Sequence, residues 1–228
     1  MHRHLIALLM GGSFLASCGG ANGNAGERAQ APVPEPATGS GTVSGNQVAG
    51  KVEGPAAATP AFDCSRADSS IEELICQSSD LAALDRQMAE VYAAAQKSSK
   101  GQQDKLLKAS QVGWIKGRND CWKSDDRSAC VSDLYRRRMA ELQARYELVA
   151  SKGPVVYRCT EGEVLAVFYD TEPRTALVRF DGEESLMYLE PSGSGARYQG
   201  RNESLWEHHG EVAIIWGHDA PEMRCKLE

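Results

Sequence analysis

The sequence lacks any long apolar run after its first 18 residues. A helix needs roughly 20 apolar residues to cross a bilayer, so this chain of 228 residues is not a polytopic membrane protein. The sequence also lacks an excess of basic residues. Its 25 basic and 31 acidic side chains give a net charge of -6, which argues against nucleic acid as the main partner because phosphate binding requires a basic surface. With 42% hydrophobic residues, the chain is too apolar to be wholly disordered and long enough for two small domains.

The N-terminus predicts export and lipidation. Residues 1–17 are typical of a signal peptide, because a polar and partly basic start precedes a short apolar stretch over residues 5–15. Residues 15–18, Leu-Ala-Ser-Cys, resemble the lipobox of bacterial lipoproteins, which implies cleavage before Cys18 and acylation of Cys18. No Asp follows Cys18, which by the same resemblance implies sorting to the outer membrane. We therefore expect a protein that is lipid-anchored in the cell envelope and faces the periplasm.

Residues 18–60 are predicted to be a disordered tether that begins with the lipidated cysteine. Residues 19–60 contain 9 Gly, 5 Pro and no aromatic residue, and such a composition cannot bury enough apolar surface to fold. A flexible chain of this length spans on the order of 35 Å. The tether would hold the first domain at about that distance from its anchor.

Residues 61–150 carry a helical pattern. Apolar residues recur every three or four positions in three segments, which lie within residues 81–95, 107–118 and 131–146. Turn sequences at residues 98–101 and 123–129 separate these segments, which predicts three helices packed as a small bundle. Residues 61–149 hold 14 basic and 14 acidic side chains, so their charges cancel.

From residue 153 onward the pattern changes to alternation. Five short segments alternate or carry β-branched and aromatic residues, with turn sequences between them: residues 164–169, 175–180, 184–189, 204–208 and 212–216. Short, evenly spaced strands favour a small antiparallel barrel or sandwich. Acidic residues outnumber basic ones here, which favours a basic partner. The expected fold is multidomain α plus β, with a disulfide-linked helical bundle over residues 61–150 and an antiparallel β-barrel over residues 153–228.

The helical part resembles the LprI family of lysozyme-inhibitor domains along nearly its whole length. The resemblance rests on four cysteines with an intervening Gln, Trp and Arg at helical spacing. The matching residues are Cys64 to Ala67, Glu72 to Cys76, Leu84, Asp85, Tyr92, Gln111 to Trp114, Arg118, Cys121, Cys130 and Tyr135. Gln111, Trp114 and Arg118 share one helix face. We expect Trp114 in the core, with Gln111 and Arg118 satisfying buried polar groups between helices.

The β part resembles the membrane-bound inhibitors of C-type lysozyme, the MliC family, over residues 156–226. The matching residues are Tyr157 to Cys159, Ser192 to Tyr198, Trp206, Gly210, Ala213 and Cys225. Members of that family insert a Ser-Gly-x-x-Tyr loop into the lysozyme cleft, which implies that Ser194 meets the catalytic carboxylates with Gly195 beside it and Tyr198 as its companion. One position departs from the family pattern, because His209 precedes Gly210 where the family usually has Lys.

The chemistry of this loop suits a lysozyme cleft on physical grounds as well. Lysozyme-type hydrolysis uses one protonated and one ionised carboxyl group, and the Ser194 hydroxyl can accept a hydrogen bond from the first and donate one to the second. Glycines beside Ser194 let the backbone enter a narrow slot. Arg197 or a protonated His209 could add a charge-assisted hydrogen bond. We predict an inhibitor of C-type lysozyme with Ser194, Gly195, Arg197, Tyr198 and His209 at the interface.

Six cysteines remain once Cys18 is acylated, an even number that predicts disulfides in an oxidising compartment: Cys64, Cys76, Cys121, Cys130, Cys159 and Cys225. Cys159 and Cys225 lie near the start and end of the β part and would tie its terminal strands together. The four cysteines of the helical part permit three connectivities. We expect Cys76 to pair with Cys121, because antiparallel packing places the start of the first long helix beside the end of the second. Cys64 would then pair with Cys130.

The β part also admits three other interpretations. His208, His209 and His218 could bind a metal, but neighbouring residues on a strand point to opposite faces, so no metal or other cofactor is expected. Ser194 with a His and Asp219 could form a hydrolase triad, but no nucleophile-elbow motif surrounds Ser194 and we expect no enzymatic activity. The main alternative is a non-enzymatic envelope module that binds another cationic protein, a peptide or a glycan.

Overall fold

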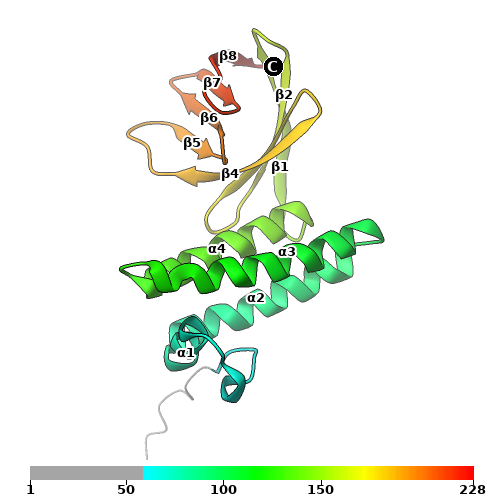
Figure 1. Ribbon diagram of the computed structural model, residues 1–228. Helices are drawn as coiled ribbons and strands as arrows, with labels where there is room; N and C mark the ends of the chain where they lie inside the picture. Colours follow the sequence, from blue (N-terminus) through cyan, green and yellow to red (C-terminus); the bar gives the residue numbers. More distant parts are fainter. Residues whose placement is uncertain (1–58) are drawn as a thin grey trace, which may run out of the picture. The chain divides into compact units, whose positions relative to one another are not determined.

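The computed structural model describes residues 59–228 (Figure 1). The predicted signal peptide, Cys18 and nearly all of the predicted tether lie outside the described residues. Within these residues, four α-helices come first and eight β-strands follow. Residues 59–228 include no helix that is both long and apolar enough to span a bilayer.

The helical part consists of α1 (Ser70–Gln77), α2 (Ser79–Ser98), α3 (Gln102–Asn119) and α4 (Arg127–Arg145), with short 3-10 helices at Cys64–Arg66 and Asp120–Lys123. Three of these α-helices correspond to the predicted segments, and α1 is an addition. Ser69, Ser78 and Asp126 cap α1, α2 and α4, each by accepting a hydrogen bond from a backbone amide in the first turn. Gly101, with a φ of 61°, precedes α3. Local capping chemistry therefore sets where these helices begin.

A buried polar network holds the helices together. The Arg118 guanidinium is 4% exposed and donates a hydrogen bond to the Tyr135 hydroxyl at 2.8 Å. Tyr135 in turn donates to Asp85 at 2.7 Å, and burial raises the pKa of Tyr135 above its usual range. Gln111 accepts from Arg138 at 3.1 Å, and the Trp114 indole donates to the Leu134 carbonyl at 3.3 Å. The expected structural roles of Gln111 and Arg118 are confirmed, whereas Trp114 is half-buried and packs against the helical core from its edge.

The disulfides of the helical part join neighbours in the chain. Cys64 bonds to Cys76 and Cys121 bonds to Cys130, with sequence separations of 12 and 9 residues. The expected pairs, Cys76 with Cys121 and Cys64 with Cys130, are wrong. The reason is that Cys76 belongs to the separate short helix α1 rather than to the first long helix. Each bridge fastens a 3-10 segment to an adjacent helix.

The strands are β1 (Ser151–Cys159), β2 (Glu163–Tyr169), β3 (Thr175–Phe180), β4 (Glu183–Glu190), β5 (Ala196–Gln199), β6 (Glu203–His208), β7 (Glu211–Trp216) and β8 (Glu222–Leu227). Each strand pairs antiparallel with the next, and β8 pairs with β1, so the sheet closes into a barrel. Of the barrel and the sandwich, the barrel is confirmed. Cys159 and Cys225 face each other across β1 and β8 and form the expected disulfide.

Side chains fill the interior of the barrel, as expected for eight strands. Alternate residues of the strands point inward and form one buried cluster that includes Tyr157, Val178, Met187, Leu205 and Ile214. The alternation read from the sequence therefore selects the inner face correctly. Because side chains fill the interior, exposed functional groups can gather at the loops at the two ends of the barrel.

Candidate functional site

The loop between β4 and β5, residues 191–195, is called the rim loop. Ser194 is exposed, and its hydroxyl has no hydrogen-bond partner within residues 59–228. Its backbone carbonyl, in contrast, is held from two sides. The Trp206 indole donates to the Ser194 carbonyl at 3.1 Å, and the Ser192 hydroxyl lies 3.0 Å from the same oxygen and 2.9 Å from the Gly195 carbonyl. The loop therefore fixes its backbone while leaving the Ser194 hydroxyl available to a partner.

Gly195 is required by the way the rim loop packs on β6. Its φ is +70°, and a Cβ built on it would lie 1.9 Å from the Glu207 carbonyl oxygen. No side chain can occupy that space, so Gly195 allows the loop to approach the strand. A Cβ on Gly193, one residue before Ser194, would meet nothing within 4 Å. The two glycines therefore have different roles, and only Gly195 is sterically constrained.

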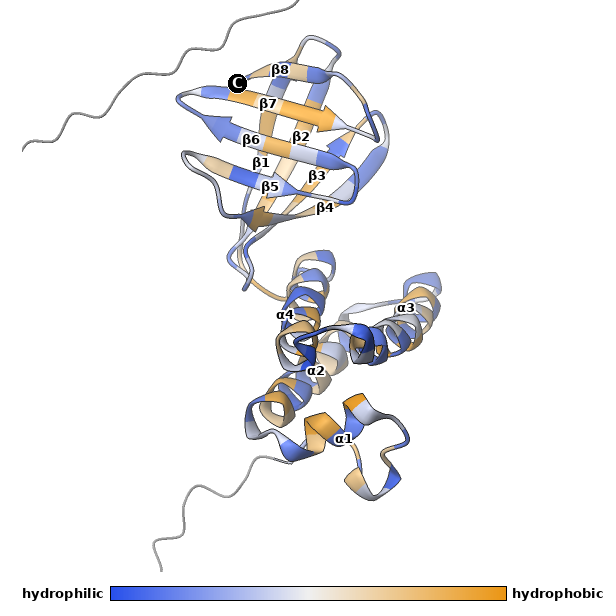
Figure 2. Ribbon diagram, turned by 60° about the vertical axis from the view of Figure 1, so that its left-hand side comes forward, coloured by the Kyte–Doolittle hydropathy of each residue, from blue (hydrophilic) through white to orange (hydrophobic). Residues whose placement is uncertain are grey.

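The turn between β6 and β7, formed by His209 and Gly210, is called the rim turn. Both residues have positive φ, 52° and 81°, the conformation that a tight two-residue hairpin requires. His209 is exposed. Ala196 pairs with Glu207, so the strand register brings the rim loop beside His208 and the start of the turn. Figure 2 shows both connections at the same end of the barrel.

Three aromatic rings link the rim loop with the rim turn. The ring centroids of Trp206 and His208 are 4.6 Å apart, and those of His208 and His209 are 4.0 Å apart. Trp206 is 37% exposed. The indole N–H of Trp206 therefore contacts the Ser194 carbonyl, and its ring contacts the His208 ring beside the rim turn.

The two remaining predicted interface residues lie on opposite sides of β5. Arg197 is exposed and sits across from Trp206 in the β5–β6 register. Tyr198 is only 8% exposed and belongs to the barrel core, where its ring lies 5.2 Å from that of Phe168. Burial also raises the pKa of the Tyr198 hydroxyl. We expected Tyr198 to accompany Ser194 at the surface, but strand alternation turns it inward.

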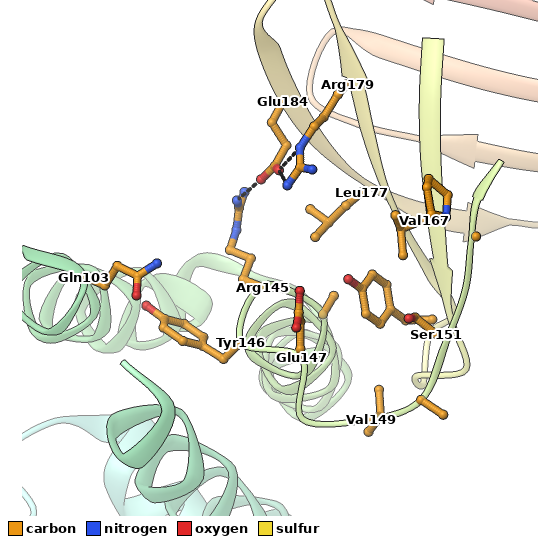
Figure 3. Close-up of a pocket in the computed structure, with 15 residues that line it drawn as sticks. Gln103, Arg145, Tyr146, Glu147, Val149, Ser151, Val167, Leu177, Arg179 and Glu184 are labelled. Atoms are coloured by element: carbon orange, nitrogen blue, oxygen red, sulfur yellow. Dashed lines mark hydrogen bonds and ion pairs between the residues drawn. The ribbon is translucent and has the colours of Figure 1, made fainter. Parts of the chain in front are cut away.

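Several hollows of similar size lie on the described part of the chain. One of about 640 Å³ is bordered by Trp206, His208, Gly210 and Arg224, and so adjoins the rim turn. Another of about 660 Å³ contains none of the predicted interface residues. In it, Arg145 and Arg179 both donate to the Glu184 carboxylate, at 3.1 and 2.9 Å (Figure 3). These contacts pair both arginines of that hollow with one of its carboxylates.

Comparison with known proteins identifies both parts. Residues 64–142 match the family model described as lysozyme inhibitor LprI. Proteins named Lipoprotein LprI from Mycobacterium bovis and Mycobacterium tuberculosis are 30% identical over 156 residues, which is 67% of this chain and 78% of theirs. The chain belongs to the LprI family. Residues 157–223 also match the model described as membrane-bound lysozyme inhibitor of C-type lysozyme, MliC.

The family matches confirm the two resemblances in their order along the chain. This LprI-family chain thus carries two modules that are each typical of lysozyme inhibitors, a helical one and a β-barrel. The lipoprotein relatives and the membrane-bound MliC description are consistent with membrane anchoring in the cell envelope.

Sequence reasoning missed the role of Trp206. It was noted as a residue shared with the MliC pattern but was given no function. Its position could have indicated this role, because Trp206 lies two residues before His208 on a strand and alternation puts both side chains on the same face. The hydrogen bond to the Ser194 carbonyl depends on the conformation of the rim loop, which no local pattern predicts.

Proposed function

We propose that the protein inhibits C-type lysozyme by inserting the rim loop into the catalytic cleft of the enzyme. The observation that carries this proposal is the exposed Ser194 hydroxyl on a backbone fixed by Trp206, Ser192 and Gly195. A rigid loop loses little conformational freedom on binding, which favours affinity. The match to the MliC model supports the same interpretation.

The roles of the rim residues follow from their positions. Ser194 would donate to the ionised catalytic carboxylate and accept from the protonated one. His209 lies at the exposed tip of the rim turn, and Arg197 lies exposed on β5, so either side chain could approach the carboxylates from beside the loop. Tyr198 would support β5 from within the barrel. The excess of acidic residues in residues 153–228 would accelerate encounter with a basic enzyme.

The proposal also includes the localisation of the protein and its action by binding alone. Acylated Cys18 would anchor it in the outer membrane, facing the periplasm, with residues 19–60 as a tether. It would act by binding and would carry out no reaction of its own. Within residues 59–228, no three His, Cys, Asp or Glu side chains gather as a metal site would require.

A lysis assay tests the proposed loop. The mature chain without its lipid, residues 19–228, would be mixed with C-type lysozyme and a cell-wall substrate. Ser194→Ala should weaken inhibition by about 1 to 3 kcal/mol, or roughly 5- to 150-fold. Ser128→Ala, which removes an exposed hydroxyl on α4 outside the barrel, should have little effect.

The results distinguish the proposal from its alternative. If the parent chain inhibits and Ser194→Ala inhibits equally, the rim loop is not the inhibitory element. If the parent chain does not inhibit C-type lysozyme at all, the acidic barrel would instead be a binding module for another cationic protein, a peptide or a glycan.

A further inference from the structure

Exposed apolar side chains are concentrated at α3 and the 3-10 helix that follows it. Leu106, Val112, Ile115 and Trp122 are 60%, 55%, 37% and 54% exposed. Within residues 59–228 only two other large hydrophobic side chains, Trp206 and Leu227, are comparably exposed. Single exposed hydrophobic residues are normal, but four within 17 residues indicate a surface that contacts a partner.

The periodicity of α3 places Val112 on the side opposite its buried face, with Leu106 and Ile115 on the two flanks. Leu107, Gln111 and Arg118 are buried against the other helices. Lys105, Val112 and Lys116 follow one another at helical spacing along the outward side. Cβ atoms on Gly113 and Gly117 would meet nothing within 4 Å, so this side of α3 is open. Hydrophobic and hydrophilic residues alternate along α3 in Figure 2.

The same face carries positive charge. Residues 105–119 contain no Asp or Glu, and Lys105, Lys108 and Lys116 are exposed. Of these three lysines, only Lys108 forms an ion pair within the described residues, with Asp104 at 2.7 Å. Lysine ammonium groups interspersed with aliphatic side chains present both charge and apolar area to whatever contacts this face.

Trp122 extends the surface beyond the end of α3. The preceding residue, Cys121, is buried and bonded to Cys130, so the disulfide fixes the 3-10 segment that carries Trp122. The Lys123 ammonium lies 5.5 Å from the centre of the Trp122 ring. An exposed tryptophan beside a lysine is the combination found where proteins meet the headgroup region of a bilayer.

We propose that these residues form a docking surface for an anionic phospholipid bilayer. This α3 surface consists of Lys105, Leu106, Lys108, Val112, Ile115, Lys116 and Trp122. The positive charges of the lysines complement the negative charges of the phosphate headgroups. The aliphatic and indole side chains can reach the boundary between the headgroups and the acyl chains. The basic α3 surface suits an anionic membrane better than it suits a basic enzyme, whereas acidic residues predominate in the barrel.

Membrane anchoring makes weak docking effective. A protein tethered to a bilayer meets it at a high local concentration, so a few modest contacts suffice to hold it there. The α3 surface would then hold the helical part in contact with the bilayer, whereas the tether alone would allow it to stay away from the bilayer. This inference does not depend on lysozyme inhibition.

Vesicle binding of the unacylated chain, residues 19–228, tests the inference directly. This chain retains every described residue and has no lipid of its own. It should sediment with vesicles that contain about 30% phosphatidylglycerol in phosphatidylcholine and not with phosphatidylcholine alone, and salt should weaken the binding. Combined Lys105→Gln, Lys108→Gln and Lys116→Gln should reduce binding about fivefold per lysine, or roughly a hundredfold together.

A matched control has the same net charge but leaves the surface intact. Lys97, Lys152 and Lys226 are exposed and lie outside the α3 surface. Their replacement by Gln should reduce binding far less than the α3 triple variant does. Tryptophan emission should shift to the blue on vesicle binding in the parent chain and in Trp206→Phe, but not in Trp122→Phe.

Three results would overturn the inference. The first is failure to bind anionic vesicles. The second is equal loss of binding by the control and the α3 triple variant. The third is a dimer in sedimentation analysis without vesicles that Trp122→Ala dissociates, because a second copy would then occupy the surface.

Discussion

Replacement of Gly195 by Ala would test whether the conformation of the rim loop controls inhibition. At a φ of +70° an L-residue is strained by about 1 kcal/mol. The new Cβ would also lie 1.9 Å from the Glu207 carbonyl, where contacts below 3.0 Å are essentially never found. The loop must therefore move away from β6, and the hydrogen bond from Trp206 to the Ser194 carbonyl would break.

The magnitude follows from these lost contacts. The hydrogen bond contributes about 1 kcal/mol, and a displaced Ser194 forfeits a contact of about 1 to 3 kcal/mol with lysozyme. Together these losses amount to about 2 to 4 kcal/mol, so we expect Gly195→Ala to weaken inhibition by roughly 30- to 900-fold. Gly193→Ala is the matched control, because its Cβ meets nothing within 4 Å and inhibition should stay within about twofold of the parent chain.

Lysis inhibition by the two variants would be measured beside circular dichroism and thermal unfolding. No residue of the rim loop belongs to the barrel core, so both variants should remain folded. A folded Gly195→Ala protein that inhibits as well as the parent chain would refute the role of the loop conformation. Equal losses for both variants would show that any substitution in the loop is harmful.

Further predictions concern the disulfides, charge and anchor. Replacing Cys159 and Cys225 by Ser should destabilise the barrel by about 4 kcal/mol in the chain-entropy model, given their separation of 66 residues; an unchanged urea midpoint would contradict this. His209→Lys should place a permanent cation at the exposed tip of the rim turn and strengthen inhibition; unchanged inhibition would exclude position 209 as the cationic contact. Burial opposes ionisation of Glu72, but hydrogen bonds from Asp68 and Asn119 and the charge of Arg118 outweigh it and lower the pKa of Glu72 below 4.5. Its stabilising contribution should therefore be present at neutral pH and disappear as pH falls through that lowered pKa, so unfolding curves of Glu72→Gln and the parent chain should converge in acid. Mass spectrometry of the mature protein should find Cys18 acylated, and an unmodified thiol would exclude the lipid anchor.

The helical part shows where sequence patterns succeed and where they stop. Three long helices follow from apolar spacing, because each extends over several turns. The short helix α1 was missed, although Ser69 followed by Glu72 is a recognisable start signal. Missing α1 also misled the disulfide prediction, because Cys76 was then assigned to the long helix that follows.

The sequence by itself determined the fold class, the two modules and the barrel disulfide. Helical periodicity, strand alternation and cysteine parity are local or countable properties, so they can be read without coordinates. It also singled out Ser194, Gly195, Arg197 and His209, which lie at or beside one rim of the barrel. The inward direction of Tyr198 follows from alternation once the strand is known.

Only the tertiary structure decided what surrounds these residues. The hydrogen bond of Trp206 to the Ser194 carbonyl joins residues 12 positions apart, and the space that Gly195 requires is set by a carbonyl on another strand. The openness of the α3 surface likewise depends on which side of the helix its neighbours cover. Such contacts depend on how separate elements pack, and packing is a property of the whole fold rather than of any segment.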